Sequence, residues 1–279
     1  MNTTLRDAML RLQRDGLDRL DAQMLLLLAL QRSAHDRAWL LAHDGDVLEA
    51  PAKLLLDELV QRRERGEPMA YLRGDQEFFG LQLQVDPRVL VPRPDTETLV
   101  NWALDMLDTN GKQASVLDLG TGSGAIALAL ASQRPMASVS ATDASAEALV
   151  VARANAQRLG LPVQFHAGSW LEAVPGQRYD LIVSNPPYIA DGDPHLAALT
   201  HEPLSALTAG ADGLNDIRAI IAKAPQSLAP GGWLLIEHGF DQAATVRALL
   251  QTAGFERVSS RTDLAAIERC SGGQWPQQR

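Results

Sequence analysis

Hydrophobic side chains in the first 65 residues recur at three- and four-residue spacing, which is the spacing of one face of an α-helix. One series begins at Leu5 and another at Leu17, and a third follows Pro51, which can open a helix at its first turn. Gly66 then offers a C-terminal stop. The polar faces lack the basic character of helices that lie on a membrane, so the pattern predicts the core of a small helical bundle.

A different pattern follows the helical region. Residues 77–85 and 89–91 form short alternating segments, and turn-forming residues such as Gly74 and Gly80 interrupt the chain around them. Short alternation with glycine and proline between segments is typical of hairpins and loops. We therefore predict a β-hairpin linker between two domains.

After a further helical stretch at residues 96–107, strand and helix patterns alternate. The expected strands are 115–119, 138–142, 163–166, 179–184, 232–237 and 256–261, and the expected helices are 125–132, 146–159 and 242–253. Such alternation implies a parallel sheet covered by helices. The expected fold class is α/β, with the helical bundle at residues 1–73, the hairpin linker at 74–95 and the α/β domain at 96–279.

Composition and charge narrow the function. Of the 279 residues, 46% are hydrophobic and 21% are charged, which is typical of a soluble globular protein. The net charge is −9, and both the first 97 residues and the remainder carry more acidic than basic side chains, which argues against tight binding of a nucleic acid backbone. The lone Cys270 and six dispersed histidines offer no disulfide and no metal-ligand spacing. Because no segment resembles a signal peptide or membrane span, we expect a cytoplasmic protein without a metal.

A glycine-rich loop, Gly120-Thr121-Gly122-Ser123-Gly124, follows the first strand of the α/β domain and leads directly into a helical stretch. Gly120 permits a tight turn, Gly122 lets the backbone approach a ligand, and Gly124 allows close packing of the helix. The helix N-terminus supplies unpaired N–H groups. The same run also fits the dinucleotide fingerprint GxGxxA, so it indicates a cofactor site without deciding the cofactor.

Asp143 ends the second strand of this domain, 19 residues after Gly124. Dinucleotide sites place the acid that binds ribose hydroxyls about 20 residues beyond the glycine loop. Asp143 is therefore a candidate ribose ligand, although an Asp here can also cap the helix that begins near Ala144. The loop and Asp143 together predict an adenosine-type cofactor at the carboxyl ends of a parallel sheet.

The run Asn185-Pro186-Pro187-Tyr188 follows the strand at 179–184 and carries the most specific chemistry. Two prolines make the turn rigid and leave carbonyl acceptors, while Asn185 adds a side-chain carbonyl and Tyr188 a flat stacking surface. These groups suit a planar amino group, whose nitrogen is a poor nucleophile because its lone pair is delocalised. Acceptors that hold both N–H bonds orient that nitrogen towards an electrophile and disperse the developing positive charge. The run therefore predicts N-methylation.

Several motifs together resemble those of the release factor glutamine methyltransferases, which transfer a methyl group from S-adenosyl-L-methionine to the glutamine of the Gly-Gly-Gln tip of bacterial peptide chain release factors. The resemblance covers nearly the whole chain and rests on EPMAYLRG at 67–74, EFFG at 77–80, VPRPDTE at 91–97, DLGTGSGAIALAL at 118–130 and SNPPYI at 184–189. NPPY is shared with adenine methyltransferases, whereas VPRPDTE upstream of the glycine loop is much narrower. The resemblance implies a Rossmann-like S-adenosylmethionine-dependent methyltransferase domain and an N-terminal helical bundle that recognises the substrate.

The resemblance also implies the roles of individual residues. It assigns the cofactor, with S-adenosyl-L-homocysteine as product, to Gly120, Thr121, Gly122, Ser123, Gly124, Asp143, Trp170 and Asn185. It assigns the substrate glutamine to Asn185, Pro186, Pro187 and Tyr188, with Asn185, Pro186 and Tyr188 as the catalytic residues. Trp170 also suits a position in the core. No strong base is required, because the methylated amide nitrogen can lose its proton to water. The expected partners are class 1 release factors, and we expect a monomer that binds neither nucleic acid nor a membrane.

Some residues near these motifs have no assigned role. Arg93 and Glu97 suit either a wall of the site or an ion pair that ties down the following helix. His201 and Glu202 follow NPPY in a loop that we expect to be flexible and solvated, with substrate contact as the alternative. Residues 191–202 form a shorter segment than in many relatives and lack the Arg-Phe pair expected before Glu202, which leaves the contacts of this loop open.

The C-terminal region contains its own Gly-Gly-Gln, formed by Gly272, Gly273 and Gln274. Self-methylation and mimicry of the substrate are the functional alternatives. A three-residue match is weak, however, so we expect a chance match in a flexible tail.

Alternative functions share parts of this pattern. A sister glutamine methyltransferase that acts on a ribosomal protein has the same fold, cofactor and NPPY, and VPRPDTE favours the release factor enzyme over it. An adenine N6 methyltransferase requires a basic groove and a flipped-base pocket, which the acidic charge opposes. An NAD-dependent oxidoreductase fits the glycine loop and Asp143 but leaves NPPY without a role, and a non-enzymatic binding module accounts only for the helical bundle.

Overall fold

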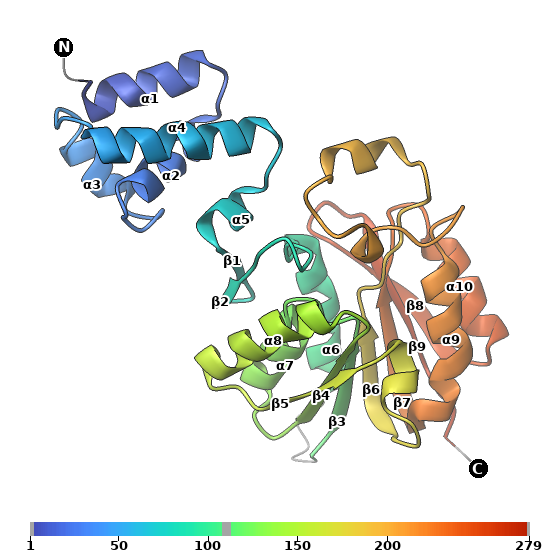
Figure 1. The fold of residues 1–279 in the computed structure, drawn as a ribbon. Helices are drawn as coiled ribbons and strands as arrows, with labels where there is room; N and C mark the ends of the chain where they lie inside the picture. The colour runs from blue at the N-terminus through green and yellow to red at the C-terminus, as the bar shows by residue number, and fades with distance from the viewer. Residues whose placement is uncertain (1–2, 108–112, 278–279) are drawn as a thin grey trace. The chain divides into compact units, whose positions relative to one another are not determined.

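The computed structural model describes residues 3–107 and 113–277. The chain divides into two compact units, Met1–Gly74 and Asp75–Arg279. Figure 1 shows helices throughout the first unit and a central sheet with helices on both faces in the second.

The first unit is a helical bundle, as the leucine spacing predicts. Leu12, Leu25 and Leu56, from three different helices, are fully buried in its core. Gly66 has a φ of +90° and follows the last turn of the fourth helix, which confirms the predicted stop. The helices are α1 (Leu5–Arg14), α2 (Arg19–Ala29), α3 (Arg37–Ala42), α4 (Ala50–Glu64) and α5 (Met69–Arg73).

The second unit begins with the predicted β-hairpin, formed by β1 (Asp75–Phe78) and β2 (Leu81–Gln84). The hairpin is shorter than the pattern predicts, because the alternating segment at 89–91 forms no strand. Pro87 and Pro92 flank that segment and cannot donate to a strand ladder, so the chain runs there as a turn and loop.

A seven-stranded sheet forms the centre of the second unit, in the order β5-β4-β3-β6-β7-β9-β8. All neighbours from β5 to β7 are parallel, and β9 is antiparallel to both β7 and β8. This mostly parallel sheet confirms the Rossmann-like α/β class. The strands are β3 (Ser115–Leu119), β4 (Ser138–Asp143), β5 (Val163–Ala167), β6 (Tyr179–Ser184), β7 (Leu228–Glu237), β8 (Glu256–Thr262) and β9 (Glu268–Gln274).

Helices cover both faces of this sheet and bury a hydrophobic core on each (Figure 1). Trp102 and Leu128 belong to one core, and Ile217 and Val246 belong to the other. The α-helices are α6 (Glu97–Met106), α7 (Ala125–Gln133), α8 (Ala146–Leu159), α9 (Asn215–Ser227) and α10 (Ala243–Thr252). Short 3₁₀ helices occur at η1 (Pro94–Thr96), η2 (Trp170–Ala173), η3 (Pro194–Ala198) and η4 (Leu204–Ala206).

The order of strands reverses direction between β3 and β6. From β3 the chain adds β4 and β5 on one side, and then returns to add β6 and β7 on the other side. Crevices open at such a switch point, outside the carboxyl ends of the strands, and open α/β sheets bind their ligands there. The glycine loop follows β3 and the NPPY run follows β6, so the topology brings both to this position.

The C-terminal Gly-Gly-Gln belongs to strand β9, so the expectation of a flexible tail is wrong. A Cβ at Gly272 would lie 2.4 Å from Cδ2 of Leu235, and one at Gly273 would lie 2.9 Å from Cβ of Phe255. The Gln274 side chain donates a hydrogen bond to the carbonyl of Gly231 at 2.8 Å. The two glycines therefore allow close packing within the sheet, and the segment is held in place on both sides.

Candidate active site

A cavity of about 330 Å³ lies at the switch point. Residues that follow several different strands meet around it. The order of the strands in the sheet brings them together, although they are far apart in the sequence. Its lining includes six of the predicted site residues, namely Gly120, Gly122, Asp143, Trp170, Asn185 and Pro187. The structure thus brings the glycine loop, the acid after β4 and the NPPY run to one place.

The glycine loop has the backbone that its sequence predicts. Gly120, Gly122 and Gly124 all have positive φ, a conformation in which a side chain is strained. A Cβ at Gly120 would lie 2.9 Å from Cζ3 of Trp170, whereas a Cβ at Gly122 would meet no atom within 4 Å. Gly120 therefore makes room for the indole ring, and the backbone at Gly122 borders open space.

Thr121 and Ser123 are buried, and neither of them lines the cavity. The Thr121 hydroxyl donates to Oδ2 of Asp118 at 2.6 Å, and the Ser123 carbonyl accepts from Nδ2 of Asn155 at 3.0 Å. These two residues shape the loop from behind. Their assignment to the cofactor stays a prediction.

Asp118 is fully buried beneath the loop. Burial raises the pKa of its carboxyl to about 7, although hydrogen bonds from the Thr121 hydroxyl and the Ala127 N–H lower it. The second carboxyl oxygen, Oδ1, is buried without a hydrogen-bond partner among the described residues. The carboxyl thus joins the glycine loop to the first turn of α7 through Oδ2, while Oδ1 remains buried away from water.

Asp143 uses both carboxyl oxygens to hold the cavity wall. Oδ2 accepts from the N–H of Gly122, and Oδ1 accepts from the N–H of Ser145, each at 2.8 Å. The cap of α8 is Ser145, whose hydroxyl accepts from the N–H of Ala148. Ser145, and not Asp143, is therefore the cap of α8. The Asp143 carboxylate lies at the cavity and links β4 to the glycine loop.

Trp170 lies in the cavity wall with a φ of +47°, a conformation that is uncommon for an aromatic residue. Burial raises the pKa of the Asp216 carboxyl in α9, and the indole of Trp170 opposes that rise. The ring also packs against the core on this face of the sheet. Trp170 therefore lies both at the cavity and against the core, and its contact with the adenine stays a prediction.

The NPPY run borders both the large cavity and a second one of about 80 Å³. The smaller cavity is lined by Asn185, Pro186 and Tyr188, together with residues of the loop that follows. Asn185 borders both cavities. The Tyr188 carbonyl accepts from Nε2 of Gln242 at 3.0 Å, which holds the end of the run against the start of α10.

Arg93, which lines the smaller cavity, forms an ion pair with Glu202. The Glu202 side chain is 1% exposed and also accepts from the N–H of Val91 at 2.9 Å. The expectation that Glu202 lies in a solvated loop is therefore wrong. Glu97 does not pair with Arg93, because its carboxylate accepts from the N–H of Phe79 at 3.0 Å. The VPRPDTE segment is thus tied to the hairpin on one side and to the loop after NPPY on the other.

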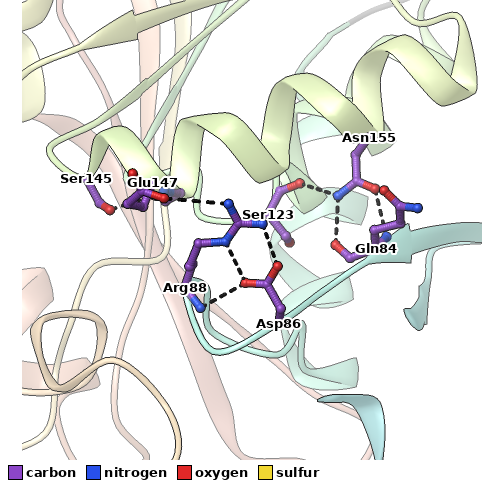
Figure 2. A network of polar contacts seen from close by, with 8 residues as sticks. Gln84, Asp86, Arg88, Ser123, Ser145, Glu147 and Asn155 are labelled. Atoms are coloured by element: carbon purple, nitrogen blue, oxygen red, sulfur yellow. Dashed lines mark hydrogen bonds and ion pairs between the residues drawn. The ribbon is translucent and has the colours of Figure 1, made fainter. Parts of the chain in front are cut away.

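Asn155 supports the site from behind the glycine loop, and sequence reasoning missed it. Figure 2 shows it in α8, where Nδ2 donates to the carbonyls of Gln84 and Ser123 and Oδ1 accepts from the N–H of Gln84. Beside it, Arg88 pairs with Asp86 and approaches Glu147 at 3.5 Å. This network holds residues 84–88 beside the glycine loop. A fully buried polar residue in a helix could have signalled it, but burial is visible only in the fold.

The lining of the larger cavity fits an adenosine-type cofactor. Its volume lies in the range of small-molecule sites, roughly 300–1,000 Å³. The Asp143 carboxylate suits ribose hydroxyls, the Trp170 ring suits a purine, and the open backbone at Gly122 leaves room for close approach. With NPPY at its border, the fold and the site define an S-adenosylmethionine-dependent methyltransferase.

Curated relatives specify this class further. Release factor glutamine methyltransferase of Bordetella pertussis is 54% identical over 92% of this chain and 95% of its own, and that of Xylella fastidiosa is 50% identical over 96% and 98%. The chain belongs to the release factor glutamine methyltransferase family, as its motifs predict. Residues 3–74 match the PrmC N-terminal domain, and residues 96–210 match the Methyltransferase small domain.

Solved structures share the fold at low identity. A methyltransferase from Pyrococcus furiosus superposes with a TM-score of 0.55 at 20% identity, over 78% of this chain and 99% of its own. A T. thermophilus 16S rRNA N2 G1207 methyltransferase in complex with AdoMet and guanosine has a TM-score of 0.55 at 21% identity, over 72% of this chain and 49% of its own. None of the helices in the described ranges has the length and apolar character to cross a membrane.

Proposed function

We propose that this protein transfers the methyl group of S-adenosyl-L-methionine to the side-chain amide nitrogen of the glutamine in the Gly-Gly-Gln motif of class 1 peptide chain release factors. The name shared by relatives at 45–54% identity supports this assignment. The observation that carries it is the position of Asn185 between two cavities, one with the volume of a small-molecule site and one of about 80 Å³. Because the chain belongs to this family, a ribosomal protein or a nucleic acid is not favoured as the substrate, and NAD is not favoured as the cofactor.

The cofactor would be held by the residues around the larger cavity. Asp143 would accept from the ribose hydroxyls, since each of its oxygens keeps a lone pair beside the backbone bond it accepts. Trp170 would lie against the adenine, and the backbone of Gly120 to Gly124 would contact the remainder. When bound, the cofactor supplies a methyl group that the sulfonium already activates.

The glutamine side chain would enter the smaller cavity from the release factor. The side-chain carbonyl of Asn185 and the backbone carbonyl of Pro186 would each accept from one N–H of its amide, while Pro187 and Tyr188 would confine it. Because Pro186 and Pro187 are buried and the proline rings restrict their backbone, the Pro186 carbonyl would need little rearrangement to accept from the substrate. These residues orient the nitrogen, exclude water and spread the charge that develops on it.

The remaining assignments concern the parts of the chain and its surroundings. We assign substrate recognition to the helical bundle at residues 1–73, connection to residues 74–95 and methyl transfer to residues 96–279. The net charge of −9 supports a protein partner in preference to a nucleic acid. We further infer a monomer that works in the cytoplasm, where release factors are used.

The test incubates the purified protein with isotope-labelled S-adenosyl-L-methionine and a class 1 release factor. Mass spectrometry then locates the label in wild-type factor and in a factor whose Gly-Gly-Gln glutamine is replaced by alanine. Label on that glutamine alone is the expected result. Label that persists in the replaced factor, or that appears only when a ribosomal protein or an RNA is supplied, would overturn the proposal.

A further inference from the structure

Three residues in the described part of the chain line both cavities of the site. They are Leu90, Asn185 and Ala206. Asn185 belongs to NPPY and is the polar member, whereas Leu90 and Ala206 are apolar and lie on two other segments. The two cavities therefore adjoin at these three residues, and the proposed function leaves two of the three without a role.

The segment that carries Leu90 is anchored by a buried side chain from another part of the fold. The N–H of Val91, the next residue, donates to Oε1 of Glu202 at 2.9 Å. The guanidinium of Arg93 pairs with Oε2 of the same glutamate. Leu90 itself is half-buried. Its position between the cavities is thus fixed by the loop that follows NPPY.

The segment that carries Ala206 is anchored to the end of NPPY. Ala206 ends the 3₁₀ helix η4. The carbonyl of Leu207 accepts from the N–H of Ile189, the residue directly after NPPY, at 2.9 Å. The loop at residues 202–207 is therefore bonded to the segment of Leu90 at one end and to the NPPY segment at the other, which holds the three bordering residues in a fixed arrangement.

Methyl transfer has to pass these residues when the cofactor occupies the larger cavity and the glutamine occupies the smaller one. The amide nitrogen forms the new N–C bond with its electron pair, the C–S bond breaks with its electron pair passing to sulfur, and the nitrogen gives its surplus proton to water. One carbon atom therefore moves from one cavity to the other. The side chains that line both cavities are placed to confine the group that moves.

We infer that Leu90 and Ala206 are specificity-determining residues that limit the size of the transferred group, so that the site accepts a methyl substituent on sulfur and rejects a larger alkyl group. The inference rests on the proposed function, which puts the cofactor in the larger cavity and the glutamine in the smaller one. A hydrophobic site distinguishes groups that differ by one methylene by about 10–200-fold. Shortening Leu90 should make room at the boundary, and enlarging Ala206 should remove it.

The test compares Leu90→Ala, which widens the boundary, with Ala206→Val, which narrows it. Leu264→Ala, at a fully exposed position, is the matched control for the loss of a leucine side chain. Isothermal titration calorimetry gives Kd for three ligands that differ only at sulfur. They are S-adenosyl-L-homocysteine without the alkyl group, S-adenosyl-L-methionine with methyl and S-adenosyl-L-ethionine with ethyl. Turnover of the last two on a class 1 release factor gives the ratio of ethyl to methyl transfer.

In the wild-type protein we expect the ethyl compound to bind about ten-fold or more weakly than the methyl compound. Leu90→Ala should reduce this Kd ratio at least about three-fold and increase the ratio of ethyl to methyl transfer, because the removed atoms leave space for one further carbon. Ala206→Val should increase the Kd ratio and slow methyl transfer. Kd for S-adenosyl-L-homocysteine should stay within a few-fold of wild type in both variants, and Leu264→Ala should behave as wild type.

Thermal midpoints report whether each variant is folded, and Leu90→Val should change both ratios in the same direction as Leu90→Ala if the alanine variant does not fold. Equal Kd values for the ethyl and methyl compounds in wild-type protein would overturn the inference. So would unchanged ratios in a folded Leu90→Ala protein, or a change of the same sign in Ala206→Val.

The wild-type protein separates this inference from the proposed function. If wild-type protein fails to label the tip glutamine with methyl, the proposed function is wrong. If it labels the glutamine and the two ratios do not respond to Leu90→Ala, only the size limit is wrong.

Discussion

Oδ2 of Asp143 accepts a hydrogen bond from the backbone N–H of Gly122 at 2.8 Å. The bond joins the end of β4 to the glycine loop after β3, which are the two elements that border the larger cavity. A carboxylate that already holds the loop presents its remaining lone pairs at a fixed position, which lowers the entropy lost on binding. The same residue therefore shapes the cavity and offers acceptors within it.

Asp143→Ala should weaken cofactor binding more than it slows methyl transfer. The substitution removes both the acceptors proposed for the ribose and the bond to Gly122, so we expect Kd for S-adenosyl-L-homocysteine to rise at least about ten-fold. At saturating cofactor, kcat should fall by a smaller factor. Isothermal titration calorimetry and steady-state kinetics measure the two effects, and an unchanged Kd would contradict the assignment.

Asn185→Ala should have the opposite profile. Its carboxamide is the proposed acceptor for the reacting amide, so we expect kcat to fall by roughly a hundred-fold or more. Kd for S-adenosyl-L-homocysteine should stay within a few-fold of wild type, because the Asp143 and Trp170 side of the cavity is untouched. Equal losses of affinity and turnover in both this variant and Asp143→Ala would show that the two residues do not divide the roles.

Gly272→Ala should destabilise the protein without any involvement of methylation. The new Cβ would lie 2.4 Å from Leu235 and 2.7 Å from the Leu234 carbonyl, inside a packed sheet. Such overpacking costs about 1–3 kcal/mol of unfolding free energy. Urea unfolding measures it, with Gly45→Ala as the control because an added Cβ there meets nothing within 4 Å. Wild-type stability of Gly272→Ala would contradict the close packing of β9.

Stability should fall as the pH rises from about 4 to about 7, and Asp118 should account for part of the fall. Burial raises the pKa of Asp118 to about 7, whereas in the unfolded chain it titrates near its ordinary value of about 3.9. Between these values the native state holds more protons than the unfolded chain, so the unfolding free energy decreases with pH. The raised pKa of Glu237, about 7, contributes with the same sign.

Asp118→Asn checks this contribution, because the amide oxygen can still accept from the Thr121 hydroxyl while no proton is exchanged. Thermal midpoints between pH 4.5 and 7.5 should fall less in this variant than in wild type. Outside that window the two curves should run parallel. Equal slopes within the window would mean that Asp118 titrates alike in the folded and unfolded chains.

Much of the site was predictable because its signals are local. The spacing of leucines predicts helices, alternation of strands and helices predicts the parallel sheet, and positive φ at Gly120 follows from a loop that only glycine tolerates. NPPY predicts acceptors for an amino group because two prolines remove backbone N–H donors and hold the remaining carbonyls in a rigid turn. In each case the physical constraint acts between residues a few positions apart.

Other features depended on contacts between distant segments. Glu202 follows NPPY in a segment whose sequence suggests a polar loop. Only the fold buries its side chain, where it accepts from the N–H of Val91 and forms an ion pair with Arg93. The sequence does not predict a strand at Gly272, because a glycine pair has low strand propensity. Its pairing partners in β7 are also more than 30 residues away along the chain.

The sequence by itself determined the class of fold, the cofactor loop and the acceptor run, since these follow from local spacing and from the chemistry of single motifs. Tertiary structure alone decided which groups stand behind them. Thr96 and Asn185 are 89 residues apart and form a hydrogen bond only because η1 and the carboxyl end of β6 come together. Burial and the direction of a hydrogen bond are properties of that assembly, so no pattern along the chain encodes them visibly.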